Sequence, residues 1–366
     1  MFNDSATMPR PAEDETTPLR GPKAGHCCIS IGGGERSFEV KKGDLLLLSA
    51  LAQGIDYPHN CRVGTCGSCK TRLLRGRISP MVDFALSPLT NQELQDGYIL
   101  ACQAKVRSDL EVEVRLGQQV MQPARTVSSR VVGWRKLAGD VIDLRLRLDA
   151  PLPFKGGQYC TMAASGSFTR RSYSFYDVPP DPAGPGAHEV GFLVKRLPGG
   201  RFSEWLFAGD RSGTKIWIEG PFGAMGVEDF DRDGLCVAGG TGLAPILSIV
   251  GDRLGRSEST RFTIVFGVRS AQDAFANQRL NLLMEQAQGR VRLVTIVSQE
   301  PAGSAWPGLR GAVTDALDGS LGVDYSAVAA FVCGSLGMVE AVERKLIGLG
   351  VDAGRIHADK FIPTGY

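Results

Sequence analysis

Four of the nine cysteines constrain this chain more than any other feature, because they stand at a fixed spacing. Cys61, Cys66 and Cys69 form a C-x4-C-x2-C run, and Cys102 follows after 32 intervening residues. This is the spacing of plant-type [2Fe-2S] sites, in which three thiolates come from one tight loop and the fourth from elsewhere. The sequence therefore predicts an iron-sulfur centre on these four residues.

A four-thiolate zinc site and loosely placed free cysteines are the alternative interpretations. Zinc sites usually pair one C-x2-C with another, whereas here one such pair is accompanied by two single cysteines. Gly64 and Gly67 further favour the cluster, because they let backbone N-H groups turn toward the sulfurs and stabilise the reduced form. The other cysteines in apparent strands are expected to be small buried hydrophobic residues; they are Cys27, Cys28, Cys160 and Cys236.

Length and composition set the number of domains and the class of protein. At about 150 residues per domain, 366 residues predict two to three domains. A net charge of +2 implies neither a nucleic-acid-binding patch nor an acidic tail. No uncharged apolar run reaches the length of a membrane span. Residues 1–24 lack the apolar core of a secretory signal and are expected to form a flexible leader. This absence and the odd number of cysteines favour a cytoplasmic location.

The residues after the leader begin with a compact β-rich pattern. Residues 28–31 and 37–40 flank three glycines and predict a hairpin, and a short helix is expected at about 45–53. After the strand-like residues 110–114, a stretch rich in glycine, glutamine and proline predicts a linker at 118–124. The first domain is therefore expected to span 25–117.

Two further patterns follow the linker. Alternating apolar and polar residues, as at 141–148, predict an antiparallel β-barrel. From about residue 228, short apolar strands alternate with helices and predict a parallel sheet covered on both faces. The predicted strands of this sheet include 235–238, 262–266, 291–295 and 329–333.

In this order, the segments resemble the reductase components of bacterial aromatic-ring dioxygenases and diiron monooxygenases. Residues 25–117 resemble a plant-type ferredoxin domain of the β-grasp fold. Residues 125–227 resemble an FAD-binding β-barrel domain, and residues 228–366 a Rossmann-like NAD(P)-binding domain, together a ferredoxin-NADP reductase module. The run at 198–211 is most similar to the reductases of xylene-type monooxygenases. The resemblance covers nearly the whole chain beyond the leader.

The middle segment carries the family's R-x-Y-S flavin motif at residues 171–174. The resemblance implies that Tyr173 stacks on the isoalloxazine ring, Ser174 faces its N5 atom and Arg171 holds the diphosphate. It also implies that a G-x-x-S turn opens a helix toward the diphosphate, although an ordinary helix cap is the alternative. FAD rather than FMN follows from the resemblance alone. The implied flavin-binding residues are Arg171, Ser172, Tyr173, Ser174, Phe192, Val194, Gly199, Gly200 and Ser203.

The last segment carries a glycine-rich loop at residues 239–245, between a buried strand and a helix, as a phosphate-binding loop requires. Pro245 replaces the third glycine of G-x-G-x-x-G and suits a first helical turn. Two later strand ends, at 267–269 and 333–338, are expected to meet this loop over one dinucleotide. The implied nucleotide-binding residues are Gly240, Thr241, Gly242, Pro245, Gly267, Arg269, Cys333, Gly334 and Met338.

Three residues are expected at the reacting centre, namely Ser174, Cys333 and Phe361. The resemblance places Cys333 near the nicotinamide and Phe361 against the flavin, whereas a buried thiol and plain core packing are the respective alternatives. Arg269 could equally be a solvated surface charge. Asp273, an acid close to Arg269, favours NADH over NADPH.

The resemblance implies an NADH-dependent oxidoreductase. Hydride would pass from NADH to FAD, and single electrons would pass through the [2Fe-2S] cluster to a partner Rieske or diiron oxygenase acting on aromatic or other apolar compounds. The sequence leaves open whether that partner is embedded in a membrane. Two alternatives also stay open: a reductase of the same architecture that serves a sugar-deoxygenation enzyme, and a redox-sensing binding protein.

Overall fold

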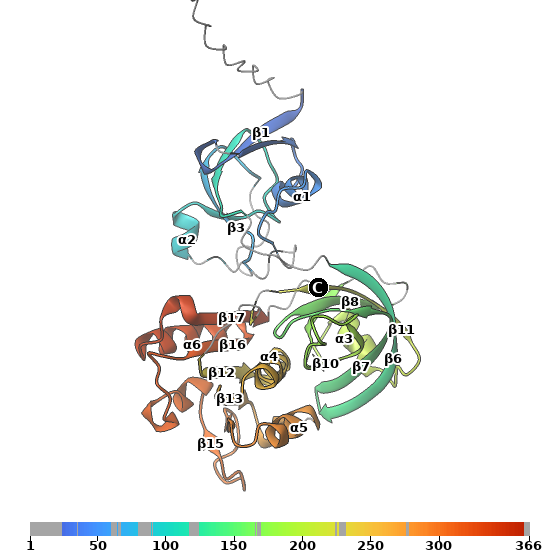
Figure 1. Cartoon of the computed structure of the whole chain (residues 1–366), viewed down its shortest axis with the longest axis vertical. Helices are drawn as coiled ribbons and strands as arrows, with labels where there is room; N and C mark the ends of the chain where they lie inside the picture. The colour runs from blue at the N-terminus through green and yellow to red at the C-terminus, as the bar shows by residue number, and fades with distance from the viewer. Residues whose placement is uncertain are drawn as a thin grey trace, which may run out of the picture.

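The computed structural model of the chain shows three bodies in sequence order (Figure 1). It describes residues 24–34, 36–59, 64, 67–79, 89, 91–116, 124–164, 166, 170–223, 225–226, 232–275 and 278–361. Apart from residues 24 and 124, the predicted leader and linker lie outside this range.

The first domain is a five-stranded mixed sheet in the order β2-β1-β5-β3-β4, with β1 and β5 parallel. The predicted hairpin is confirmed, since Ile29 of β1 pairs with Phe38 of β2. The predicted helix is also confirmed, as α1, whose Leu46, Leu47 and Ala50 are fully buried against the sheet. The elements are β1 (His26–Ile31), β2 (Arg36–Lys41), α1 (Leu46–Ala52), β3 (Lys70–Arg75), α2 (Asn91–Gln95), β4 (Tyr98–Leu100) and β5 (Leu110–Glu113).

The second domain is an antiparallel barrel in the order β10-β7-β6-β11-β8-β9. A bridge between Phe175 and Phe192 joins the two end strands and closes the barrel around an apolar core. The alternating pattern at 141–148 predicted this sheet. The structure agrees, because the inward apolar residues of this stretch of β7 are buried in the barrel core. The elements are β6 (Arg125–Ala138), β7 (Val141–Leu152), β8 (Tyr159–Ala164), β9 (Arg171–Ser174), β10 (Ala187–Lys195), α3 (Arg201–Phe207) and β11 (Lys215–Phe222).

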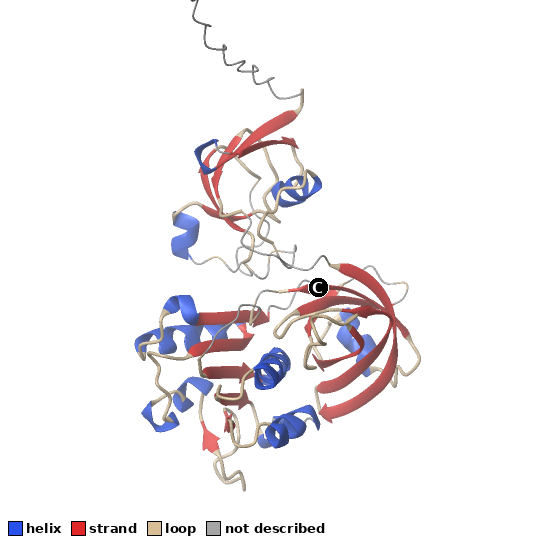
Figure 2. Ribbon diagram, viewed as in Figure 1, coloured by secondary structure: helices blue, strands red, loops and turns tan. Residues whose placement is uncertain are grey.

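The third domain is a parallel sheet in the order β15-β14-β13-β12-β16-β17. Helices cover both faces, as the apolar strands predicted: α4 and α5 pack on one face and α6 on the other (Figure 2). The main elements are β12 (Gly234–Gly239), α4 (Leu243–Arg256), β13 (Phe262–Val268), α5 (Gln278–Gln286), β14 (Val291–Val297), β15 (Leu309–Arg310), β16 (Ala329–Ser335), α6 (Leu336–Gly348) and β17 (Ile356–Phe361).

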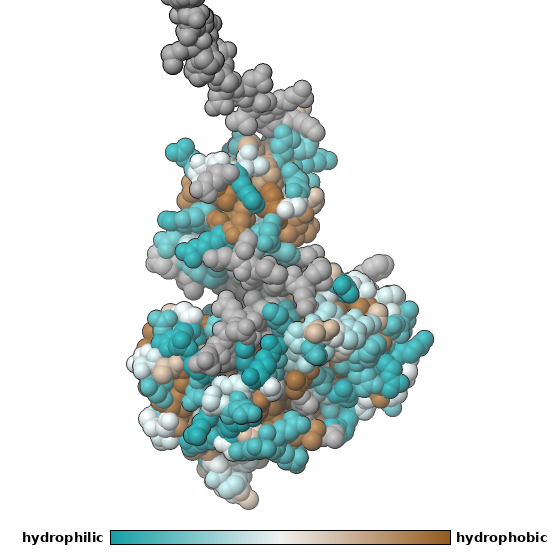
Figure 3. Space-filling view, in the orientation of Figure 1, coloured by the Kyte–Doolittle hydropathy of each residue, from teal (hydrophilic) through white to brown (hydrophobic). Residues whose placement is uncertain are grey.

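The visible face of the second and third domains is mainly hydrophilic, with apolar residues interspersed (Figure 3). Among the described residues, no helix combines the length and the apolar character needed to cross a bilayer.

Candidate functional site

Two of the four predicted cluster ligands lie side by side in the first domain. Cys69 directly precedes β3 and Cys102 closely follows β4, and these two strands pair antiparallel. The Ala101 N-H donates a hydrogen bond to the Cys69 carbonyl at 3.1 Å, and both cysteines are only 2% exposed. Cys61 and Cys66 lie outside the described residues. The described half of the site therefore fits the predicted cluster.

Glycine shapes the loop that carries the other ligands. Gly64 has φ of +88° and Gly67 has φ of +74°, a region that residues with a Cβ atom rarely adopt. A Cβ atom on Gly64 would also lie 3.0 Å from the side chain of Gln103. The backbone at these two positions therefore requires glycine, and the predicted turn of their N-H groups toward the sulfurs stays a prediction.

A buried hydrogen-bond chain supports Cys69. The fully buried Tyr57 hydroxyl lies 2.7 Å from Thr71 Oγ1, which in turn donates to the Cys69 carbonyl at 3.1 Å. Burial raises the pKa of the Tyr57 phenol, so the hydroxyl stays protonated and available as a donor. No sequence motif indicated this support, because Tyr57 and Thr71 are 14 residues apart and meet only through the fold.

The second and third domains share one large cavity of about 870 Å³. Its walls combine β9 with the carboxyl ends of the parallel strands, where open α/β sheets bind ligands. The main contributions are residues 171–174, 239–241, 267–269, 335–338 and 359–361. The cavity is large enough for much of a dinucleotide, since small-molecule pockets typically measure about 300–1,000 Å³. It brings the predicted flavin strand and all three predicted nucleotide loops together.

The four residues of the R-x-Y-S motif line the cavity from the barrel side. The Tyr173 ring packs on Phe202 of α3, with ring centroids 5.5 Å apart. Phe192 and Val194, by contrast, are fully buried in the barrel core. Their side chains therefore support the barrel, and any contact of these two residues with a flavin would come from the backbone.

The predicted G-x-x-S turn lies directly before α3. Gly199 has φ of +75°, and a Cβ atom on Gly200 would lie 2.6 Å from Ser203 Oγ. The Ser203 hydroxyl accepts a hydrogen bond from the Leu197 N-H at 3.1 Å. Ser203 is the third residue of α3, whose N-cap is Gly200 without a side-chain capping bond, so its hydroxyl is turned toward the backbone of the preceding turn and does not cap the helix.

Gly240 and Thr241 line the cavity, whereas Gly242 and Pro245 are buried next to it. A Cβ atom on Gly242 would overlap the carbonyl oxygen of Cys333, so this position needs glycine for close contact between α4 and β16. Gly267 and Met338 also line the cavity. The loop thus forms as predicted, with Pro245 inside the first turn of α4.

Cys333 lies behind the cavity wall. Its side chain is fully buried, and its Sγ atom lies 3.4 Å from Sδ of Met225. Burial, and to a lesser extent the Asp359 carboxylate, raises the pKa of the thiol well above its ordinary value. The structure thus shows Cys333 as a buried thiol at the end of β16. Phe361, which was expected against the flavin, lines the cavity.

Arg269 is held by acids from two domains. Its Nη2 atom lies 2.7 Å from Asp140 on the β6-β7 turn, and its Nε atom lies 3.5 Å from Asp273. Lys195 approaches the same Asp140 carboxylate at 3.7 Å. All four side chains line the cavity. The sequence reasoning missed Asp140 and Lys195, because neither lies in a motif and only the domain arrangement brings them to Arg269.

Three family models match the chain in the order of its domains. The 2Fe-2S iron-sulfur cluster binding domain matches residues 29–107, the oxidoreductase FAD-binding domain 128–226 and the oxidoreductase NAD-binding domain 236–344. The [2Fe-2S], FAD and NAD assignments are therefore confirmed at the level of whole domains.

Curated relatives match almost end to end. The chain is 36% identical to the xylene/toluene monooxygenase electron transfer component of Pseudomonas putida, over 91% of this chain and 93% of the relative. It is 32% identical to the reductase component of the naphthalene 1,2-dioxygenase system of the same species, over 92% and 99%.

Solved structures agree with these relatives. An Amycolatopsis cytochrome P450 reductase superposes with a TM-score of 0.72 at 31% identity, covering 92% of this chain and 99% of the other. The ferredoxin reductase of carbazole 1,9a-dioxygenase gives 0.68 at 28% identity, covering 92% and 98%. The chain therefore belongs to the family of electron-transfer reductase components of bacterial multicomponent oxygenases.

Proposed function

We propose that this protein takes reducing equivalents from NADH and delivers them singly to a terminal oxygenase that acts on aromatic or other apolar compounds. One observation carries the proposal: the cavity joins the flavin strand to all three nucleotide loops, and a cluster-binding domain precedes it on the same chain. When bound, the flavin supplies the exchange between the two-electron chemistry of a nicotinamide and the one-electron chemistry of a cluster.

The chain's own residues bind and orient in this scheme. We assign Arg171 to the flavin diphosphate, Tyr173 to stacking on the ring and Ser174 to a hydrogen bond near its reacting edge. Phe361 covers the cavity from β17. Cys333, fully buried and held neutral, contributes packing behind the nicotinamide position rather than a proton.

We propose NADH as the preferred dinucleotide. Two carboxylates, Asp140 and Asp273, lie beside Arg269 on the cavity wall. The 2'-phosphate of NADPH is repelled by carboxylates and needs an unpaired cation, whereas a ribose 2'-hydroxyl does not. Both acids already engage Arg269, so this wall suits NADH better than NADPH.

The partner and the setting follow from the relatives and the cysteines. The relatives serve systems named for xylene, naphthalene and carbazole, so we propose a partner of this class and extend the proposal to a membrane-embedded one. Five described cysteines outside the cluster set form no disulfide, which supports a reducing cytoplasmic location; they are Cys27, Cys28, Cys160, Cys236 and Cys333. We also propose domain limits at 25–117, 125–227 and 228–366.

The test is a Cys102→Ser variant of the full chain loaded with flavin and cluster. We expect it to lose the cluster's visible absorption and nearly all cytochrome c reduction, while NADH still bleaches the flavin. Cys28→Ser, in which the altered residue lies on β1 rather than beside β4, is the matched control and should keep both activities. Undiminished cytochrome c reduction by Cys102→Ser would contradict the assignment. A wild-type protein whose flavin is not bleached by NADH would instead support a redox-sensing binding protein.

A further inference from the structure

Helix α4 links the nucleotide loop to the flavin barrel. It begins directly after the Gly240–Gly242 turn, and it lies between the parallel sheet and the barrel (Figures 1 and 2). Its Ser248 is fully buried and donates a hydrogen bond across the domain boundary to the Asp177 carbonyl at 2.6 Å. A single rigid element thus touches both halves of the cavity.

Two glycines of the barrel domain, Gly156 and Gly226, let this helix pack closely against the barrel, and we call this contact the glycine seat. A Cβ atom on Gly156 would lie 3.0 Å from Ile249 Cα and 3.1 Å from the Ser248 carbonyl oxygen. A Cβ atom on Gly226 would lie 2.7 Å from the Ile249 side chain. Arg253 of α4, 6% exposed, donates to the Gly226 carbonyl at 3.3 Å. Helix and barrel are therefore packed at backbone distance, with no space for a methyl group between them.

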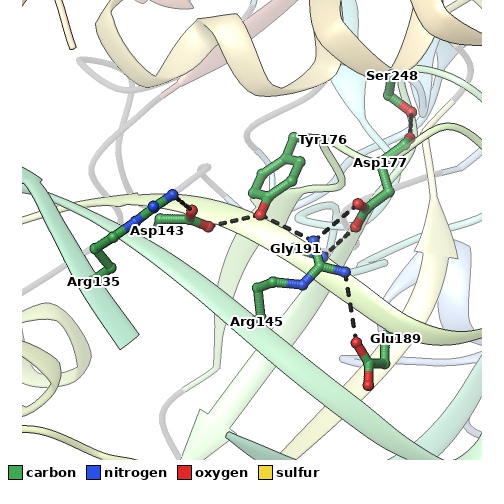
Figure 4. Close-up of polar contacts among 8 residues, drawn as sticks. All are labelled: Arg135, Asp143, Arg145, Tyr176, Asp177, Glu189, Gly191 and Ser248. Carbon is green, nitrogen blue, oxygen red and sulfur yellow. Dashed lines mark hydrogen bonds and ion pairs between the residues drawn. The ribbon is translucent and has the colours of Figure 1, made fainter. Parts of the chain in front are cut away.

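A partly buried polar network holds the barrel side of this contact in place (Figure 4). The Tyr176 hydroxyl donates to Asp143 at 2.7 Å, and Arg145 donates both to that hydroxyl at 3.2 Å and to Asp177 at 3.1 Å. The Asp177 carboxylate also accepts the Gly191 N-H at 2.5 Å. Although burial opposes it, the charge of Asp177 raises the pKa of Arg145, so this guanidinium stays charged.

The same network continues the flavin strand. β9 ends at Ser174, and Tyr176 and Asp177 follow within three residues. The Tyr176 N-H donates to the Gly191 carbonyl at 3.1 Å, which ties this segment to β10. The Tyr176 ring itself packs in the core cluster that contains α4. The flavin motif is therefore connected to the nucleotide loop through Tyr176 and Asp177, which follow β9 directly, and through α4, which packs against them.

We propose that Tyr176, Asp177 and the glycine seat around Ser248 and Ile249 act as positioning residues for hydride transfer. They set the separation between β9 and the nucleotide loop, and hence between the flavin and nicotinamide rings. This proposal rests on the proposed function, because it presumes that NADH reduces a flavin in the shared cavity. Hydride transfer is sensitive to such a separation, since a misplacement of about 1 Å can slow a reaction by about 10²-fold.

The test inserts one methyl group into the seat. Gly156→Ala needs no left-handed backbone, but it forces α4 away from the barrel by a few tenths of an ångström. Gly255→Ala makes the same chemical change on α4, at a site with nothing within 4 Å, and is the matched control. Both are compared with wild type as holoenzymes, by the rate of flavin bleaching in stopped flow. A second readout is the long-wavelength charge-transfer absorption of NAD⁺ over the reduced flavin, which requires ring overlap.

We expect Gly156→Ala to bleach about tenfold more slowly and to weaken the charge-transfer absorption, with flavin content unchanged and Gly255→Ala like wild type. Should Gly156→Ala not fold, Ser248→Ala tests the same contact by removing only the cross-domain hydrogen bond, with a smaller loss of rate in the same direction. The proposal would be overturned if a folded Gly156→Ala variant showed wild-type bleaching rates and charge-transfer absorption. If Ser248→Ala is the variant used, the same result would overturn it. A wild-type protein whose flavin NADH does not bleach would instead overturn the proposed function.

Discussion

The ion pair between Arg269 and Asp140 offers a sharp test of nucleotide binding, because its two partners should act in opposite directions. Arg269 lies on the nucleotide loop after β13, and Asp140 lies on a hairpin turn of the barrel. If Arg269 binds the dinucleotide, the Asp140 carboxylate competes with the ligand for it. Arg269→Ala should then weaken NADH binding, and Asp140→Asn should strengthen it.

The size of each effect follows from the exposure of the pair. A charge-assisted hydrogen bond from a guanidinium to the ligand contributes about 1.5–3 kcal/mol. The Arg269 side chain is 51% exposed and that of Asp140 25%, so the pair that must be broken contributes only about 0.2–1 kcal/mol. The difference, about 1–2 kcal/mol, predicts a KM for NADH about 5- to 30-fold higher in Arg269→Ala. Asp140→Asn should lower KM by up to about fivefold.

Steady-state reduction of ferricyanide at varied NADH concentration measures the KM for NADH in both variants. Titration of the oxidised flavin spectrum with NAD⁺ then checks whether the dissociation constants change in the same directions. Arg256→Ala is the matched control, because Arg256 also pairs with an acid, Asp252 at 2.8 Å, but neither residue lines the cavity. If Asp140→Asn raises KM as Arg269→Ala does, the pair holds the two domains together and the reasoning about ligand competition is refuted.

Three further outcomes are expected. Tyr57→Phe should release the cluster at a lower temperature, because the loss of a buried hydrogen bond costs about 1–3 kcal/mol. Tyr98→Phe, at a half-exposed site, is the control and should release the cluster at the wild-type temperature. Equal loss of visible absorption on heating in the two variants would contradict this. Iodoacetamide at pH 8.5 should label half-buried Cys28 well before Cys333, because burial raises the pKa of the Cys333 thiol and leaves it protonated and inaccessible. Peptide mass spectrometry measures both labelling rates, and equal rates would refute the assignment of Cys333 as a buried, neutral thiol. Tyr173→Ala should purify with less FAD while Tyr173→Phe retains it, and full flavin content in the alanine variant would count against stacking.

The sequence was sufficient for the features that depend on local spacing. The cysteine run predicted the cluster domain because ligand spacing is a property of one loop, and Gly64 and Gly67 do adopt the backbone that this loop requires. The alternating residues of β7 predicted the barrel, and the continuous apolar run of β12 predicted the parallel sheet, because both patterns lie in neighbouring residues. The order of the domains followed directly.

Other features were decided only by contacts between distant segments. Asp140 reaches Arg269 across 129 residues of sequence, and Ser248 reaches Asp177 across 71, so no local pattern could have indicated either contact. Cys333 shows the same limit, since its motif marks the strand end but only the packing of Met225 against it shows that the thiol is buried. The sequence by itself determined which cofactors this chain is built to hold. The tertiary structure decided how its two catalytic domains are seated on each other, because that depends on backbone contacts no motif records.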